Sequence, residues 1–102
     1  MITLNTTFHV EDEINHSFLD YMKETYFVNA NQNNRIIQSR LSKIHSHRLD
    51  EGHSYSIQFS FKTLDELESW NKTKGRELNE ELLKNFDNKI TGFSTLLEEI
   101  EL

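Results

Sequence analysis

The chain of 102 residues contains no cysteine and no long apolar run. Without cysteine, disulfide bonds and thiolate chemistry are both impossible, which fits a reducing compartment. No segment approaches the roughly 20 apolar residues that a membrane-spanning helix needs. Residues 1–5 also lack the basic and apolar regions of a signal peptide. We therefore expect a cytoplasmic protein with no membrane partner.

Positive charge is also scarce, because 11 Lys and Arg stand against 17 Asp and Glu, for a net charge of −6. A nucleic-acid backbone or an anionic membrane needs a basic face on its partner, so we expect neither as a ligand. Hydrophobic residues are only 35% of the chain, and the 7 Phe must supply much of a thin core. The length suits a single domain over residues 1–102.

Hydrophobic periodicity divides the chain into six elements. Alternation with period two predicts strands, and apolar residues three or four apart predict helices. A polar stretch at 29–34 and a turn at 50–52 separate the middle elements, and Gly75 is expected to break or kink the second helix. The predicted order is strand 2–10, helix 11–26, strand 35–47, strand 53–61, a helix from Thr63 to about residue 87, and strand 89–97.

This order predicts an α+β fold of the ferredoxin-like β-α-β-β-α-β type. Its four strands form one antiparallel sheet, and both helices pack on the same face. In strand 35–47, Ile37, Ser39 and Leu41 are assigned to the inward face, and Ile36, Arg40 and Ile44 to the outward face. The expected core consists of Ile2, Leu4, Phe8, Phe18, Ile57, Phe59, Leu67 and Trp70.

The sheet face opposite the helices is left open in this fold. Its predicted residues are Asn5, Thr7, His9, Arg40, Ser56 and Gln58, with Phe93 or Leu96 at one side. The last strand is apolar on both faces, and exposed apolar patches usually mark contact surfaces. We therefore expect a homodimer formed through the last strand and the open face.

Five short stretches of the chain resemble a small bacterial domain-of-unknown-function family, DUF4286. Proteins of this kind are similar in shape to dimeric α/β barrels, in which two open sheet faces pack around a central pocket. The resemblance implies a shape and no established activity. The stretches that carry it are Asn5-Thr6-Thr7-Phe8, Tyr21-Met22-Lys23-Glu24, Ser39-Arg40-Leu41, Tyr55-Ser56-Ile57-Gln58-Phe59 and Phe93-Ser94-Thr95-Leu96-Leu97-Glu98.

The chain departs from the family pattern at three places. Tyr26 and Val28 stand where the family tends to carry His and, two residues later, Pro. Glu81-Leu82 stands where it tends to carry Glu-His, and Ser94 replaces a family Arg. If those histidines serve a reaction in relatives, this protein lacks it.

Arg40, with Gln58, Asn5 and Thr7, forms the main candidate ligand site on the open face. The planar guanidinium suits a carboxylate or phosphate, and the neutral side chains supply further hydrogen bonds. His9 is a possible general base there. The alternative is that these groups satisfy one another across a subunit interface. The expected ligand is a small anionic or carbonyl-bearing molecule.

Two other groups of residues, the histidines and the aromatic residues of strand 53–61, are considered as a metal site and an RNA-binding surface, and neither is favoured. His45, His47 and His53 could approach one another near the turn, but their spacing matches no metal motif, so we expect a solvated hairpin tip and no metal. His16 is read as a helix-surface residue. The aromatic residues of strand 53–61 resemble an RNA-binding strand, but facing them outward would send Ser56 and Gln58 into the core.

Two functions remain open from the sequence. The first is a homodimeric module that binds a small molecule on the open face, without catalysis. The second is a cofactor-independent enzyme of the dimeric α/β-barrel, monooxygenase-like kind, a reading that rests on fold analogy alone. No cofactor is expected in either case.

Overall fold

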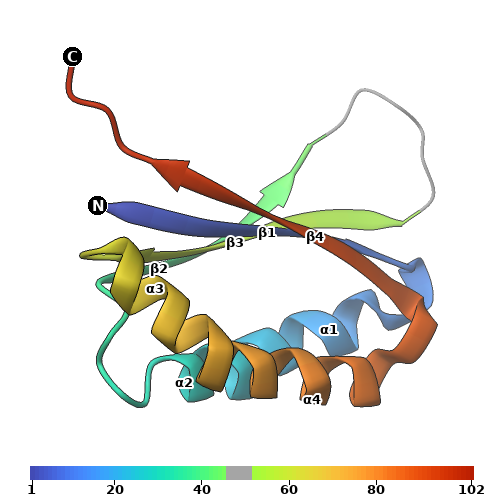
Figure 1. Ribbon diagram of the computed structural model, residues 1–102. Coiled ribbons are helices and arrows are strands. Elements are labelled where there is room, and N and C mark those ends of the chain that lie inside the picture. The colour runs from blue at the N-terminus through green and yellow to red at the C-terminus, as the bar shows by residue number, and fades with distance from the viewer. Residues whose placement is uncertain (46–51) are drawn as a thin grey trace.

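The computed structural model describes residues 1–45 and 52–102 and has the predicted α+β ferredoxin-like architecture. Its strands pair antiparallel in one sheet of order β2-β3-β1-β4, and the helices cover one face of that sheet (Figure 1). The predicted fold is therefore confirmed. The strands are β1 (Ile2–Val10), β2 (Gln38–Ile44), β3 (His53–Phe61) and β4 (Ile90–Glu98).

The first helical segment is longer and less regular than predicted. A 3-10 turn (Asp12–Ile14) leads into α1 (Asn15–Tyr21), a π-helical turn (Met22–Tyr26) and α2 (Phe27–Ala30). The helix therefore extends to Ala30, and the polar break that was predicted from residue 29 begins only after it. The π-turn is a local widening of the helix, of a kind frequently found at functional sites.

The second helical segment is continuous from Leu64 to Phe86. The Thr63 hydroxyl caps it as predicted, accepting a hydrogen bond from the Glu66 backbone N–H at 3.2 Å. Gly75 does not break the helix but ends a second π-turn. The segments are α3 (Leu64–Trp70), the π-turn (Asn71–Gly75), α4 (Arg76–Phe86) and a 3-10 turn (Asp87–Lys89).

The core lies between the sheet and the helices and is rich in aromatic rings. The Phe59 ring is 5.4 Å from Trp70, 5.3 Å from Phe27 and 6.1 Å from Tyr26, measured between ring centroids. All of the predicted core residues are buried except Ile2, which is half-buried at the start of the chain. Alternation in β1 and β3 therefore identified the inward face correctly.

The start of the second predicted strand is wrong. β2 begins only at Gln38, so strand alternation does not extend back to Ile36 and Ile37. Ile36 is buried, at 9% exposure, whereas Ile37 is 57% exposed, the reverse of the predicted orientation. Within the strand proper, Leu41 faces the helices and Arg40 the open side, as predicted.

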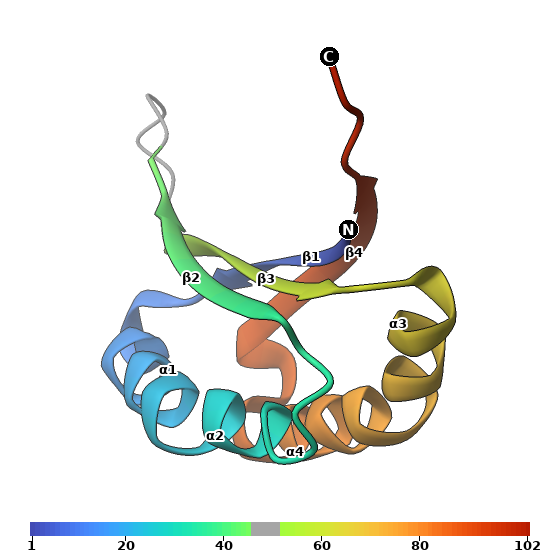
Figure 2. The same cartoon turned by 90° about the vertical axis from the view of Figure 1, so that its left-hand side faces the viewer.

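The sheet is curved rather than flat. In Figure 2 the far end of β2 and the C-terminal end of β4 both rise on the side away from the helices, so the sheet curves toward its open face. Among the described residues, no helix is long and apolar enough to cross a membrane.

Candidate functional site

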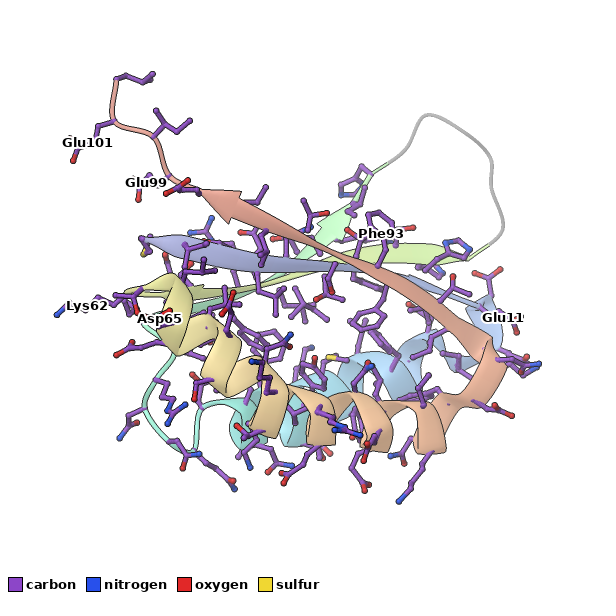
Figure 3. All side chains as sticks on the ribbon, in the orientation of Figure 1. Glu11, Lys62, Asp65, Phe93, Glu99 and Glu101 are labelled. Carbon is purple, nitrogen blue, oxygen red and sulfur yellow. The ribbon has the colours of Figure 1, made fainter. Side chains whose placement is uncertain are left out.

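The open face carries all five residues that were predicted as a site. The strand register pairs Arg40 with Gln58 and Gln58 with Asn5, so these three side chains lie in one row across the sheet. Thr7 and His9 follow along β1, on the same face, further from Arg40. On β4 this face presents Phe93 (Figure 3) and Leu97, whereas Leu96 faces the helix side.

Several polar groups of this face satisfy one another. The Asn5 amide donates to the Thr7 hydroxyl at 3.4 Å and accepts a hydrogen bond from Ser56. His9 Nδ1 lies 3.1 Å from the Ser54 hydroxyl. These hydrogen bonds all lie within one copy of the chain, and they do not converge on one point.

Arg40 and Gln58 share a shallow depression at one corner of the face. Its volume is about 260 Å³, and Glu98 and Glu99 also line it. The acidic end of the chain therefore returns to the neighbourhood of Arg40, which the sequence reasoning did not foresee. Within the described ranges no carboxylate lies within ion-pair distance of the Arg40 guanidinium.

The histidines do not assemble into a metal site in the part of the chain that is described. His53 Nε2 lies 2.9 Å from Asp12 Oδ1, and His45 is exposed. His16 pairs with Asp20 at 3.3 Å on the exposed surface of α1, as expected of a helix-surface residue. His47 falls outside the described residues.

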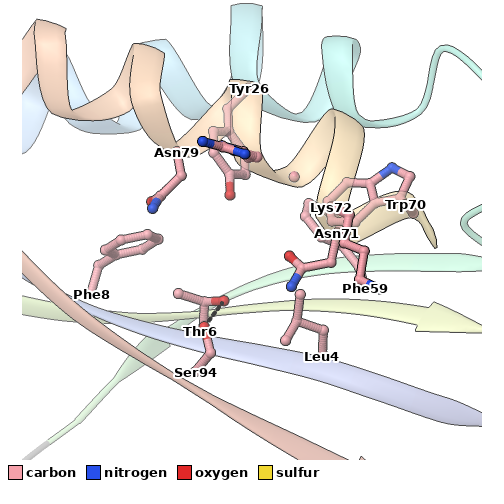
Figure 4. A pocket seen from close by; sticks show the side chains of 12 residues that line it. Leu4, Thr6, Phe8, Tyr26, Phe59, Trp70, Asn71, Lys72, Asn79 and Ser94 are labelled. Carbon is pink, nitrogen blue, oxygen red and sulfur yellow. Dashed lines mark hydrogen bonds between the residues drawn. The ribbon is translucent and has the colours of Figure 1, made fainter. Parts of the chain in front are cut away.

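A larger cavity lies on the other side of the sheet, between the inward face of β1 and the α3–α4 helix (Figure 4). Its volume is about 590 Å³, within the range of small-molecule pockets. The hydroxyls of Thr6 and Ser94 meet at its floor, 3.1 Å apart. Its lining residues are Leu4, Thr6, Phe8, Tyr26, Phe59, Trp70, Asn71, Lys72, Gly75, Arg76, Asn79 and Ser94.

Both π-turns contribute to this cavity. The first ends at Tyr26, and the second supplies Asn71, Lys72 and Gly75. Gly75 is needed there because a Cβ at this position would lie 2.9 Å from the Trp70 ring. The irregular turns of both helices therefore face the same space.

Tyr26 is the polar group most deeply placed in the cavity. Its side chain is buried, at 7% exposure, and its hydroxyl points into the open space between Phe8 and Asn71 in Figure 4. Among the described residues the hydroxyl has no hydrogen-bond partner, whereas the hydroxyl of Tyr55, which is also buried, donates to Asn15 Oδ1. In the described part of the chain no buried side-chain nitrogen or oxygen lacks a hydrogen-bond partner, so this hydroxyl is open to the cavity and is suited to meet a ligand or water.

Burial raises the pKa of Tyr26 to about 12, with a smaller contribution from Tyr21. The usual pKa of a tyrosine is 10.0, so folding favours the protonated hydroxyl, and its stabilisation is complete below pH 10. We expect stability to fall as the pH rises from about 10 to 12, by about 2–3 kcal/mol in all. Urea unfolding at pH 9 to 11 should show a steeper decline for the wild type than for Tyr26→Phe. Parallel declines would contradict this placement of the hydroxyl.

Sequence reasoning did not find the cavity. Tyr26 and Ser94 stood out only as departures from the family pattern, and Gly75 only as a helix breaker. A cavity lined by two π-turns has no periodic signature in the sequence.

The comparisons with known proteins agree on the fold. The chain is similar to a dimeric ferredoxin-like protein from an uncultured marine organism, with a TM-score of 0.72 and 15% identity over 99% of this chain and 97% of that one. A putative antibiotic biosynthesis monooxygenase from Deinococcus radiodurans aligns with a TM-score of 0.71 and 14% identity over 100% of this chain and 95% of that one.

An EthD family protein from Bacillus halodurans gives a TM-score of 0.71 and 12% identity over 98% of this chain and all of that one. No curated protein matches the chain at a significant level. At these identities the structural likeness shows the fold alone. Residues 1–100 match the profile of a domain of unknown function, and the chain therefore belongs to the DUF4286 family.

Proposed function

We propose that this protein is a homodimeric binding protein. Each copy holds a small molecule in the cavity between the sheet and the α3–α4 helix that Tyr26 lines, here called the Tyr26 cavity. The observation that carries the proposal is the hydroxyl of the buried Tyr26 side chain, which is directed into a cavity of about 590 Å³ and has no hydrogen-bond partner among the described residues. Apolar walls with a few converging polar groups are the usual composition of a ligand pocket.

The open face supports the homodimer in this proposal. Four strands about 5 Å apart and about 30 Å long give roughly 600 Å² of projected sheet area per copy, or on the order of 1,200 Å² between two copies. Side chains add accessible surface to this projected area, so the two faces can bury enough surface for a stable interface. The face also exposes apolar groups, with Phe93 at 65% and Leu97 at 44% exposure. A structural neighbour is itself described as dimeric.

Arg40 constrains how two such faces can meet. A guanidinium that a second sheet covers must find partners, because a lone buried charge is very costly. Glu98 and Glu99 line the same depression and are available for this purpose. A small anionic or carbonyl-bearing ligand beside Arg40, Gln58 and Asn5 is the second candidate site.

A cofactor-independent, monooxygenase-like enzyme is the alternative function. It is favoured by the likeness to a putative antibiotic biosynthesis monooxygenase and by a cavity large enough to enclose a substrate. Oxygen consumption that depends on a bound compound would favour the enzyme over the binding module.

A thermal-shift screen of small aromatic acids, amides and carbonyl compounds tests the two candidate sites against each other. We expect at least one compound to stabilise the wild type, with an effect that Tyr26→Phe reduces and Arg40→Ala leaves unchanged. Tyr26→Phe keeps the ring and removes only the hydroxyl, and Arg40→Ala changes an exposed side chain, so both variants should fold.

The opposite pattern, with stabilisation lost in Arg40→Ala and kept in Tyr26→Phe, would move the site to the open face. A screen in which no compound stabilises the wild type would reject small-molecule binding.

A further inference from the structure

The Tyr26 cavity has a different charge from the rest of the protein. Two cations, Lys72 and Arg76, line it, and none of its lining residues is Asp or Glu. The whole chain, in contrast, carries a net charge of −6. A cavity lined by one sign of charge raises the local concentration of the opposite ion.

The two cations lie on the same side of the helix, because positions four residues apart are neighbours on a helical surface. Arg76 Nε contacts Glu80 Oε1 at 3.4 Å, but both side chains are largely exposed, so this pair is weak. Lys72 has no carboxylate within ion-pair distance among the described residues, whereas nearby Lys74 contacts Glu77 at 3.7 Å. Lys72 therefore remains free to meet an anion.

The interior of the cavity is walled by flat rings. Phe59 and Trp70 meet edge to face at 5.4 Å, and Tyr26 stacks on Phe59 with an interplanar angle of 15°. Such walls favour a planar, conjugated body over a branched aliphatic one. The Tyr26 hydroxyl stays protonated at neutral pH, so it can donate a hydrogen bond to a ligand, as the two cations can. The three groups together favour ligands rich in acceptors.

We infer that the ligand of this cavity is a flat aromatic or conjugated molecule with one anionic group, its rings against Phe59 and Trp70 and its anion between Lys72 and Arg76. The inference rests on the proposed function and narrows the class of molecule that the cavity takes. Charge-assisted hydrogen bonds from an ammonium and a guanidinium would hold the anion.

The test compares 2-naphthoate with 2-naphthamide, which has the same ring system and no charge. Trp70 is the only Trp of the chain, so its indole N–H gives a single NMR signal. The N–H donates to the Ala30 carbonyl at 3.3 Å, and the ring that carries it lines the cavity, so the signal reports on ligands that contact the ring. We expect both compounds to shift this signal, with an affinity about tenfold higher for the naphthoate. The Lys72→Gln/Arg76→Gln variant should reduce that preference to about twofold.

Lys84→Gln is the matched control, because Lys84 lies on α4 outside the cavity and contacts Glu81 at 3.6 Å. It should keep the full preference for the naphthoate. Equal affinities in the wild type, or a preference that survives in the double variant, would overturn the inference and leave small-molecule binding in place. If neither compound shifts the Trp70 signal at millimolar concentration, the inference fails, and an empty thermal-shift screen would then reject the proposed function as well.

Discussion

Replacement of Phe59 by Ala is expected to lower the free energy of unfolding by about 3–5 kcal/mol. Phe59 is 2% exposed and contacts the rings of Tyr26, Phe27 and Trp70. The space that its ring leaves would join the existing cavity, so the surrounding side chains cannot close it by a small shift. Urea denaturation at neutral pH, followed by circular dichroism, measures the loss.

Phe93→Ala is the matched control for this experiment. Phe93 has the same side chain but lies on the opposite face of the sheet and is 65% exposed. Its removal should change the stability of a single copy by less than about 1 kcal/mol. A Phe59→Ala protein as stable as the wild type, or a larger loss for Phe93→Ala at concentrations where the protein is monomeric, would contradict the assignment of the two faces.

The second large effect is expected on assembly. Light scattering should give the wild type a mass of twice 12.1 kDa at tens of micromolar, and Thr7→Arg should return it to 12.1 kDa. Thr7 lies on β1, an inner strand, near the middle of the open face. A charge placed there in both copies faces desolvation and repulsion worth several kcal/mol, enough to weaken association by about 100-fold or more.

Ser17→Arg is the control for assembly, since Ser17 is exposed on α1, on the opposite side of the molecule. It adds the same charge and should leave the dimer intact. Dissociation by Ser17→Arg together with an intact Thr7→Arg dimer would mean that the helices form the interface. A wild type that is monomeric at tens of micromolar would reject the dimer.

The fold could be predicted because its signals are local and strong. Alternation over nine residues in β1 and in β3 assigns each side chain to a face, and the Thr63 cap marks where the second helix begins. The wrong orientation predicted for Ile36 and Ile37 also comes from a local signal. Two adjacent β-branched residues suit a strand, but nothing in the sequence shows that the chain joins the sheet only at Gln38.

The candidate site could be predicted only in part. The open-face row of Arg40, Gln58 and Asn5 follows from strand register, which alternation and the hairpin fix together. The cavity instead depends on Tyr26 and Lys72, which belong to the two π-turns and line the same space. Composition and spacing carry no signal for such turns, so the sequence analysis placed the ligand on the open face.

The most direct test of the account is a crystal structure of the protein with bound 2-naphthoate, or with a stabilising compound from the screen. We expect electron density for the ligand in the Tyr26 cavity, against Phe59 and Trp70 and within hydrogen-bond distance of the Tyr26 hydroxyl or of Lys72. Ligand density beside Arg40 and Gln58 on the open face, with the Tyr26 cavity empty, would contradict it.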